Sequence, residues 1–436
     1  MTYNISALPI YLDALNQSMP GNMMRLKISI NNNNKLVIEN TEFDIKAKIN
    51  ILAYGKASRL MYLEAKNIIG NYLGNGLLIT HEDFVEKKDF FSSQEKIIKS
   101  SHPLITEKSI KAGKEVLNFV SKGDEDDILM VLISGGGSAM VALPVDEISI
   151  KDKIDFITKV MHMSVPEREV NILKKSLSKI KGGRLAEATI ANTIVNCILS
   201  DEREHDISAI SSGMTVCNKL INPIEIMNQY NLWKVANKNI TNVINKHGVK
   251  EDIGCSKEIF NSMVGSREDL IESIVNMSKK HGFDSVHVLE NMHSCTSTEA
   301  VNVLIAQYNN IYASVGKGNH LIVTTGEIQV KVPDPFNSKG GRNQHMTAIF
   351  MLNFKVVFDF YFLAIATDGV DYINGVHGAF YDSKLQGKVQ QNKEFIQSKI
   401  KLSNSYDIHK KFGTLIEGGK TGTNVSDFFL FSFNKG

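Results

Sequence analysis

The chain has 436 residues, 43% of them hydrophobic and 22% charged, and a net charge of +2. These values are typical of a soluble globular protein of two or three domains and exclude a disordered one. The nearly balanced charge excludes an overall field for nucleic acid or an anionic membrane, so local groups must hold any anionic ligand. The four cysteines form no C-x-x-C pair, and the first 19 residues lack a signal-peptide pattern. We therefore expect a cytoplasmic chain without structural zinc or disulfides.

Strand-like and helix-like segments alternate through the first half of the chain. Two alternating segments flank Asn31–Asn34 and predict a β-hairpin. Apolar runs predict strands at residues 49–55, 76–81, 127–134 and 191–200, and helical spacing predicts helices at 56–69 and 106–120. The run at 127–134 does not alternate, as in a strand buried on both faces. This order indicates a parallel sheet flanked by helices.

The second half also predicts an α/β domain, with an antiparallel component. A weakly patterned region rich in Asn and Lys, near residues 225–260, predicts the domain boundary and gives domains at 1–235 and 256–436. The later patterns predict helices at 269–282 and 297–315, a strand–turn–strand unit at 320–332, and strands at 360–369 and 427–433.

A glycine-rich loop stands directly behind the apolar strand that ends at Ser134. Gly135, Gly136 and Gly137, which have no side chains, stand just before a helix expected to begin near Ser138. Backbone N–H groups exposed there favour phosphate or carboxylate, because no Cβ keeps the anion away. A tight structural turn is an equally good interpretation. Since Met140 occupies the last glycine position, the dinucleotide-binding and nucleophile-elbow patterns both fail.

Cationic side chains follow glycines at three further places. Lys56 stands behind a strand and a glycine, and the carboxyl ends of parallel strands face the crevice where ligands bind. The sequence Lys-Gly-Gly-Arg occurs at 181–184 and again at 339–342, and a guanidinium behind two glycines suits an anion. The alternative for each place is a turn with a solvated cation.

Acidic side chains gather at predicted strand ends. Asp201, Glu327 and Asp368 directly follow strands or their first turn, and Asp206 and Asp371 lie close behind. Acids among anion-binding groups suit Mg²⁺, which prefers oxygen ligands and substrate phosphates, although such acids often only cap helices. Residues 419–427 add small hydroxyl and amide donors.

These blocks occur in an order that is more specific than any one of them. The order runs "GKAS", "HPLITE", "SGGGSA", "LKKSLSKIKGGRLA", "LSD", "ISSG", "TTGE", "GGRNQ", "ATDGVD" and "TGTNVSD". From about residue 50 to 430 the chain resembles the glycerate 2-kinases with a MOFRL-type C-terminal domain. The resemblance implies a Rossmann-like, parallel-sheet N-terminal domain, a second, smaller α/β domain, and an active site in the interdomain cleft.

The resemblance also implies a reaction. ATP would phosphorylate the 2-hydroxyl of D-glycerate to give 2-phosphoglycerate, with Mg²⁺ required. Lys56 and Arg342 would neutralise the transferring phosphoryl group, and Asp201 would orient or deprotonate the hydroxyl or, with Asp206, hold the metal. The implied substrate- or nucleotide-binding positions are Ser134, Gly135, Gly136, Gly137, Ser138, Glu327, Asn343, Asp368 and Asn424. Partners would be small molecules, not nucleic acid or membrane, and a homodimer is left open.

The chain departs from the family's pattern at two notable places. In "SDEREHD" Glu204 replaces a glycine and His205 an aspartate, and Tyr372 replaces another glycine. One alternative is therefore a non-catalytic or altered-specificity relative that binds a sugar acid. Another is a serine hydrolase that uses Ser138, which Met140 and the lack of a positioned Asp–His pair disfavour.

Overall fold

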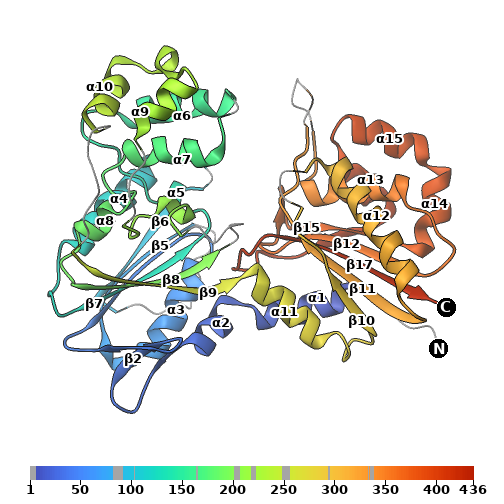
Figure 1. Cartoon of the computed structure of the whole chain (residues 1–436), viewed down its shortest axis with the longest axis horizontal. Coiled ribbons are helices and arrows are strands. Elements are labelled where there is room, and N and C mark those ends of the chain that lie inside the picture. Colours follow the sequence, from blue (N-terminus) through green and yellow to red (C-terminus); the bar gives the residue numbers. More distant parts are fainter. Residues whose placement is uncertain are drawn as a thin grey trace. The chain divides into compact units, whose positions relative to one another are not determined.

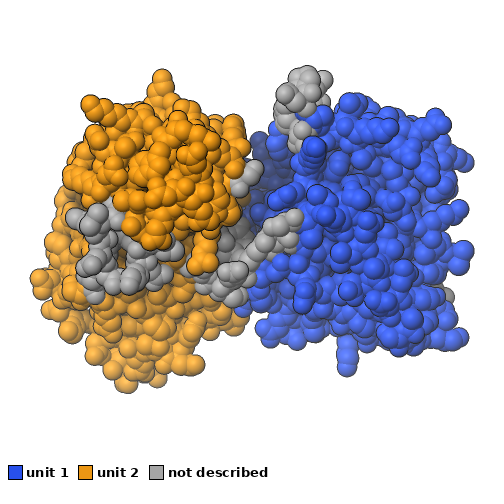
Figure 2. Space-filling view, turned by 45° about the horizontal axis from the view of Figure 1, so that its top comes forward, with its two compact units in different colours: residues 1–19, 266–436 blue, residues 20–265 orange. Residues whose placement is uncertain are grey.

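The computed structural model describes residues 6–81, 92–102, 104–163, 165–200, 207–217, 222–247, 256–292, 295–331, 333 and 338–436. The chain divides into two compact units (Figure 2). Unit 1 comprises Met1–Met19 and Ser266–Gly436, and unit 2 comprises Pro20–Gly265. The predicted domains, 1–235 and 256–436, differ from these units in two ways: unit 2 extends to residue 265, and the first 19 residues belong to the C-terminal half. Helix α1 (Leu8–Gln17) belongs with the C-terminal half because it contacts helix α11 (Arg267–Met277).

A six-stranded sheet forms the centre of unit 2. Its order is β6 (Glu95–Ser100), β5 (Leu73–His81), β4 (Ile49–Tyr54), β7 (Ile128–Ser134), β8 (Thr193–Ser200) and β9 (Glu258–Ser266). Strands β4 to β8 pair in parallel, which confirms the parallel sheet. Every residue of β4 and β7 is buried, as expected for strands covered on both faces.

Helices and a small sheet complete unit 2. The predicted hairpin is confirmed as β1 (Ile28–Ile30) and β2 (Lys35–Ile38), extended by β3 (Thr41–Asp44). The helices are α2 (Pro20–Lys27), α3 (Ser58–Ile69), α4 (Glu107–Val120), α5 (Gly137–Met140), α6 (Ile150–His162), α7 (Glu167–Ser176), α8 (Arg184–Glu187), α9 (Pro223–Gln229) and α10 (Lys238–His247). Helices α6, α7, α9 and α10 gather around an apolar cluster of their own (Figure 1).

Unit 1 contains a mixed six-stranded sheet. Its order is β10 (Ser285–Val288), β11 (Gly318–Thr325), β17 (Asp427–Lys435), β12 (Phe360–Ala366), β15 (Val376–Asp382) and β16 (Leu415–Glu417). Only β10 and β11 pair in parallel, so the antiparallel component is confirmed. The first strand of the strand–turn–strand prediction at 320–332 is confirmed as β11, but no second strand follows within residues 326–331, and β11 pairs instead with β17 from the C-terminus. A short ladder joins β13 (Val370–Asp371) to β14 (Ile373–Asn374).

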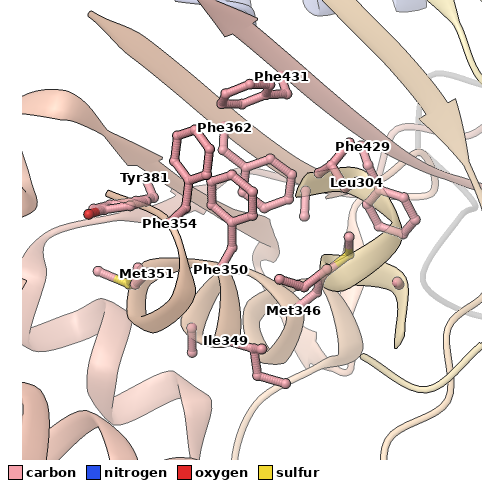
Figure 3. Close-up of a cluster of buried hydrophobic side chains, with 14 of the residues drawn as sticks. Leu304, Met346, Ile349, Phe350, Met351, Phe354, Phe362, Tyr381, Phe429 and Phe431 are labelled. Atoms are coloured by element: carbon pink, nitrogen blue, oxygen red, sulfur yellow. The ribbon is translucent and has the colours of Figure 1, made fainter. Parts of the chain in front are cut away.

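Helices cover both faces of this second sheet (Figure 1). They are α1, α11, α12 (Ser297–Ser314), α13 (Arg342–Asn353), α14 (Gln386–Gln391), α15 (Lys393–Lys401) and α16 (Ser405–Phe412). Phe350 of α13 stacks on Phe354 and Phe362 inside an aromatic core that also holds Phe431 (Figure 3). Burial of α13 from Asn343 to Met351 fixes its first turn, where Arg342 stands. Within the described ranges, no helix is long and apolar enough to cross a membrane.

Candidate active site

The turns that follow β4 and β7 lie side by side because the two strands are neighbours in the parallel sheet. The Lys56 backbone N–H donates to the Gly135 carbonyl oxygen at 2.9 Å. The Ala57 N–H donates to Ser134 Oγ at 3.0 Å. Gly55 has a φ of +117°, and a Cβ there would overlap Ser134. The lysine turn and the glycine loop therefore form one structure, built from segments far apart in the sequence.

The glycines of the loop are required by close neighbours as well as by any ligand. Gly136 has a φ of +83°, and a Cβ on it would lie 2.8 Å from the His102 ring and 3.3 Å from Lys56 Cγ. A Cβ on Gly137 would lie 2.7 Å from the Tyr54 ring. Helix α5 is only four residues long, shorter than the expected helix, so its dipole adds little to anion binding. The loop is thus a tight turn that also holds the Lys56 side chain against Gly136.

The first Lys-Gly-Gly-Arg block turns its cations toward the protein. The Arg184 guanidinium donates to the carbonyl oxygens of Lys175 (2.9 Å) and Lys181 (3.0 Å), so it holds backbone instead of facing an anion. Lys181 is 1% exposed, and its Nζ contacts the carbonyl oxygen (2.9 Å) and the Oγ of Ser138. Ser138 Oγ in turn lies 3.0 Å from Ser212 Oγ. The glycine loop is therefore backed by a buried amine.

The second block places Arg342 between two carboxylates. Arg342 Nη2 donates to Glu327 Oε1 at 2.6 Å and Nε donates to Asp427 Oδ2 at 2.5 Å. Burial lowers the pKa of the guanidinium, but Asp427 and Glu327 outweigh burial and raise the pKa above its usual value. Arg342 Nη1 donates to none of the residues that the structure describes, so one edge of the guanidinium is available to a ligand. Arg342 is thus an oriented donor whose charge is already compensated.

Two buried carboxylates hold this region together. Asp427 Oδ2 also accepts from Asn343 Nδ2 at 2.9 Å. Burial raises the pKa of Asp427 to about 7, although Arg342 opposes the shift. Asp371 accepts from the backbone N–H groups of Asn343 (3.0 Å) and Gln344 (2.9 Å), which fixes the start of α13. Burial raises the pKa of Asp371, and these hydrogen bonds oppose the rise.

The sequence pattern grouped Asp371 with the strand-end acids that suit Mg²⁺, but it did not predict that Asp371 fixes a helix start or that Asp427 pairs with Arg342. The signal was present, because each ends one of the quoted blocks, "TGTNVSD" and "ATDGVD". Asn343, expected to bind a ligand, is fully buried, and its amide nitrogen is committed to the two carboxylates. It therefore supports them in this structure.

A pocket of about 310 Å³ opens beside Arg342 within unit 1. Asp371, Asp427 and His345 share its lining with apolar side chains. Tyr372 also lines it and is 65% exposed with a φ of +64°. This left-handed backbone accounts for the glycine that the resemblance placed at position 372.

Of the remaining predicted site residues, Asp368 and Asn424 lie within the described part of the chain, and Asp201 and Asp206 do not. Asp368 Oδ1 accepts from the Val370 N–H at 3.0 Å and closes a turn, and its carbonyl oxygen accepts from the Thr421 N–H at 3.3 Å. Those contacts bring the "ATDGVD" and "TGTNVSD" blocks together, and Asn424 is 8% exposed in the second block. Asp201 and Asp206 lie outside the described residues. The described part of the chain holds no group of three or more His, Cys, Asp or Glu side chains placed to bind a metal ion.

The fold and the two polar regions define a class of protein: a parallel α/β unit with a cationic glycine loop, combined with a mixed-sheet unit that carries an arginine–carboxylate cluster. Residues 6–245 match the family described as "Domain of unknown function (DUF4147)", and residues 320–427 match the MOFRL family. The chain therefore belongs to the DUF4147 family, with a MOFRL region in its C-terminal half.

Named relatives cover nearly the whole chain. A "Glycerate 2-kinase" from Pyrococcus horikoshii is 27% identical over 91% of this chain and 90% of its own. A "D-glycerate 2-kinase" from Thermotoga maritima is 24% identical over 88% of this chain and 90% of its own. The crystal structure of a glycerate kinase from Thermotoga maritima matches with a TM-score of 0.82 and 21% identity, covering 98% of each chain, and shows the same fold.

Proposed function

We propose that the chain is a glycerate 2-kinase, which transfers the γ-phosphoryl group of ATP to the 2-hydroxyl of D-glycerate. The observation that carries this proposal is the junction of the Lys56 turn and the glycine loop, where the Lys56 N–H donates to Gly135 and Lys56 Cγ lies beside Gly136. A cation fixed against glycine backbone suits the phosphate or carboxylate of such substrates. The names of relatives that match along most of the chain support the reaction.

In this proposal the protein acts mainly by positioning and by stabilising charge, as phosphoryl transfer requires. Lys56 neutralises the transferring phosphoryl group. Arg342 contributes through Nη1, since Glu327 and Asp427 fix the plane of its guanidinium. A donor oriented in advance needs no reorganisation when charge develops on the phosphoryl oxygens.

The remaining predicted residues take binding roles in the proposal. Residues 134–138 seat the glycerate carboxylate or a phosphate, while Glu327 and Asn343 support Arg342 and its carboxylates. Asp368 and Asn424 are binding positions in the "ATDGVD" and "TGTNVSD" blocks, which the hydrogen bond between Asp368 and Thr421 brings together. Asp201 is assigned the orientation or deprotonation of the 2-hydroxyl.

Mg²⁺ would accompany ATP and shield its phosphate charges. The two carboxylates assigned to it, Asp201 and Asp206, lie outside the described residues, which hold no group of three or more His, Cys, Asp or Glu side chains placed to bind a metal ion. No step of the proposal therefore depends on a metal ion bound by the protein alone.

The test is ADP release from ATP, measured with and without D-glycerate, together with ³¹P and ¹³C NMR of the product. We expect ADP release that requires D-glycerate, and a product with phosphate on oxygen 2. Release only with another small hydroxy acid would indicate altered specificity. No release with any sugar acid would reject the kinase and favour a binding protein.

A further inference from the structure

Three polar side chains form a hydrogen-bonded cluster behind the glycine loop, and the proposed kinase reaction uses only one of them. Ser138 lies in α5, Lys181 precedes the first glycine pair, and Ser212 ends a 3₁₀ turn at Ile210–Ser212. Lys181 Nζ contacts Ser138 Oγ, which lies 3.0 Å from Ser212 Oγ. Lys181 and Ser212 are 1% and 2% exposed, whereas Ser138 is partly exposed. Ser138 is therefore the member of the cluster that is partly exposed, and the amine of Lys181 contacts its hydroxyl.

The surroundings of Lys181 favour a neutral amine. In the described part of the chain, Lys181 contacts the Ser138 carbonyl and hydroxyl and forms no ion pair with a carboxylate. Burial lowers the pKa of Lys181 well below its usual value, and the positive charges of Lys153 and Lys174 lower it further. A neutral amine has a lone pair that can accept the hydroxyl proton of Ser138.

The backbone around this cluster supplies further polar groups. Ser211 and Ser212 have φ values of +50° and +62°, a left-handed conformation that non-glycine residues adopt at a cost. The Ser212 N–H is held by the Ala209 carbonyl at 2.9 Å. The N–H groups of Gly137 and Ser138 donate to no carbonyl among the described residues.

We propose that Ser138 is a nucleophile and Lys181 its base, so that unit 2 carries a site for acyl transfer from small carboxylic esters. A serine paired with a lysine is a known arrangement for such chemistry, and it needs neither a His–Asp pair nor a glycine in place of Met140. The activity goes beyond the proposed kinase function, because it uses neither ATP nor Arg342.

The reaction balances with the ester and water alone. Ser138 Oγ attacks the carbonyl carbon and its proton passes to Lys181 Nζ, while the carbonyl electron pair moves onto oxygen. The tetrahedral adduct collapses, the carbon–oxygen bond to the alcohol breaks, and the alcohol leaves with the proton from Lys181. Water then attacks the acyl-serine and gives a proton to Lys181. The carboxylic acid is released as Ser138 recovers its proton.

The test is covalent labelling of the full chain by a fluorophosphonate, mapped to single residues by mass spectrometry. We expect the phosphonyl group on Ser138, at a rate that rises with pH and levels off below the pH at which an ordinary lysine titrates, since burial lowers the pKa of Lys181. Lys181→Met should slow labelling by about 100-fold or more, the usual contribution of a general base. Ser138→Ala should abolish the adduct.

Lys153 offers a matched control. It is another buried lysine, but its Nζ donates to the carbonyl oxygens of Lys174 and Leu177 and, among the described residues, to no serine hydroxyl. Lys153→Met should keep the Ser138 adduct and move the midpoint of the pH profile upward, because a charge that lowers the pKa of Lys181 is removed.

Two results would overturn the proposal. One is the absence of a Ser138 adduct on folded wild-type protein at pH 8, and the other is equal labelling of wild type and Lys181→Met. If Lys181→Met fails to fold by circular dichroism, the wild-type profile decides: a rate that still follows hydroxide at the pH where an ordinary lysine titrates, without levelling off, rejects the base. Because labelling requires neither ATP nor glycerate, its failure is distinct from a failure of the kinase proposal.

Discussion

The same four residues, Lys-Gly-Gly-Arg, occur once in each unit and produce opposite arrangements of charge. At 181–184 the lysine is buried and contacts a serine, and the arginine holds backbone carbonyls. At 339–342 the lysine lies 4.1 Å from the centre of the Tyr406 ring, and the arginine is bracketed by two carboxylates. The motif alone therefore does not decide which cation turns inward; the acceptors that the fold brings near it do.

The glycine pairs explain part of this difference. Gly182 and Gly183 are both left-handed, with φ values of +63° and +83°, and a helix of only four residues follows. Gly340 has a φ of +131° but Gly341 is extended, and the twelve-residue helix α13 follows. The extended residue lets Asp371 approach the start of α13, where a Cβ on Gly341 would overlap it. An arginine at that position consequently begins a long, well-anchored helix.

The largest expected effect tests the compensated arginine. Arg342→Met should lower D-glycerate-dependent ADP release by about 10²–10³-fold, the usual loss when one transition-state donor is removed. It should also lower the free energy of unfolding by about 3 kcal/mol, since Asp427 is left buried and unpaired while Arg342 itself is 35% exposed. Activity assays and urea unfolding measure the two losses. Unchanged stability would mean that Asp427 does not depend on its partner.

Replacing Lys56 should lower activity with little loss of stability, whereas replacing Arg342 should lower both. Lys56→Met should also lower ADP release by about 10²-fold or more. Its free energy of unfolding should fall by about 1 kcal/mol or less, because the side chain is partly exposed and the backbone bond to Gly135 survives. The same two assays apply, and near-normal turnover would remove Lys56 from the proposed reaction.

Local patterns predicted the elements that surround these two cations. The alternating and continuous apolar runs predicted β4, β7, β8 and β12, and Thr106, the first residue of the helix predicted at 106–120, is the N-cap of α4. The pairing of β11 with β17 was missed because it joins segments about a hundred residues apart. The segment 327–331, which directly follows β11, alternates like a strand and was therefore predicted to pair with it. Non-local pairing leaves no periodic signal in the sequence.

The sequence predicted which residues belong to the candidate site better than it predicted which partners they contact. Block order pointed to Lys56, Arg342 and the glycine loop as polar positions. It could not show that Asp427 compensates Arg342 or that Asp371 fixes the start of α13, because hydrogen-bond partners depend on how β17 and α13 meet in the fold. Burial of Lys181 was equally hidden, since a lysine in a glycine-rich turn is usually solvated.

The third prediction concerns pH and the compensated cluster. Burial raises the pKa of Asp427 to about 7 from the ordinary 3.8, so the folded state holds a proton that the unfolded state releases between these values. This contribution to stability is fully present below about pH 4 and is lost as the pH rises through about 7, with a slope of about 1.4 kcal/mol per pH unit at most. Urea unfolding of wild type and Asp427→Asn from pH 4.5 to 8 measures it. The variant should lose this slope, and an equal slope in both proteins would assign the titration to another group.

The smallest effects come from two helix caps that lie outside both polar regions. Ser149 Oγ accepts from the Asp152 N–H at 3.0 Å in unit 2, and Thr296 Oγ1 accepts from the Glu299 N–H at 3.3 Å in unit 1. Ser149→Ala and Thr296→Ala should each cost about 1 kcal/mol of unfolding free energy, the usual value of an N-cap. Neither should change ADP release at 25 °C, because the remaining stability keeps nearly all molecules folded. An activity loss from a cap as large as that of Arg342→Met would show that turnover follows stability, and the compensated arginine would then lose its separate role in the reaction.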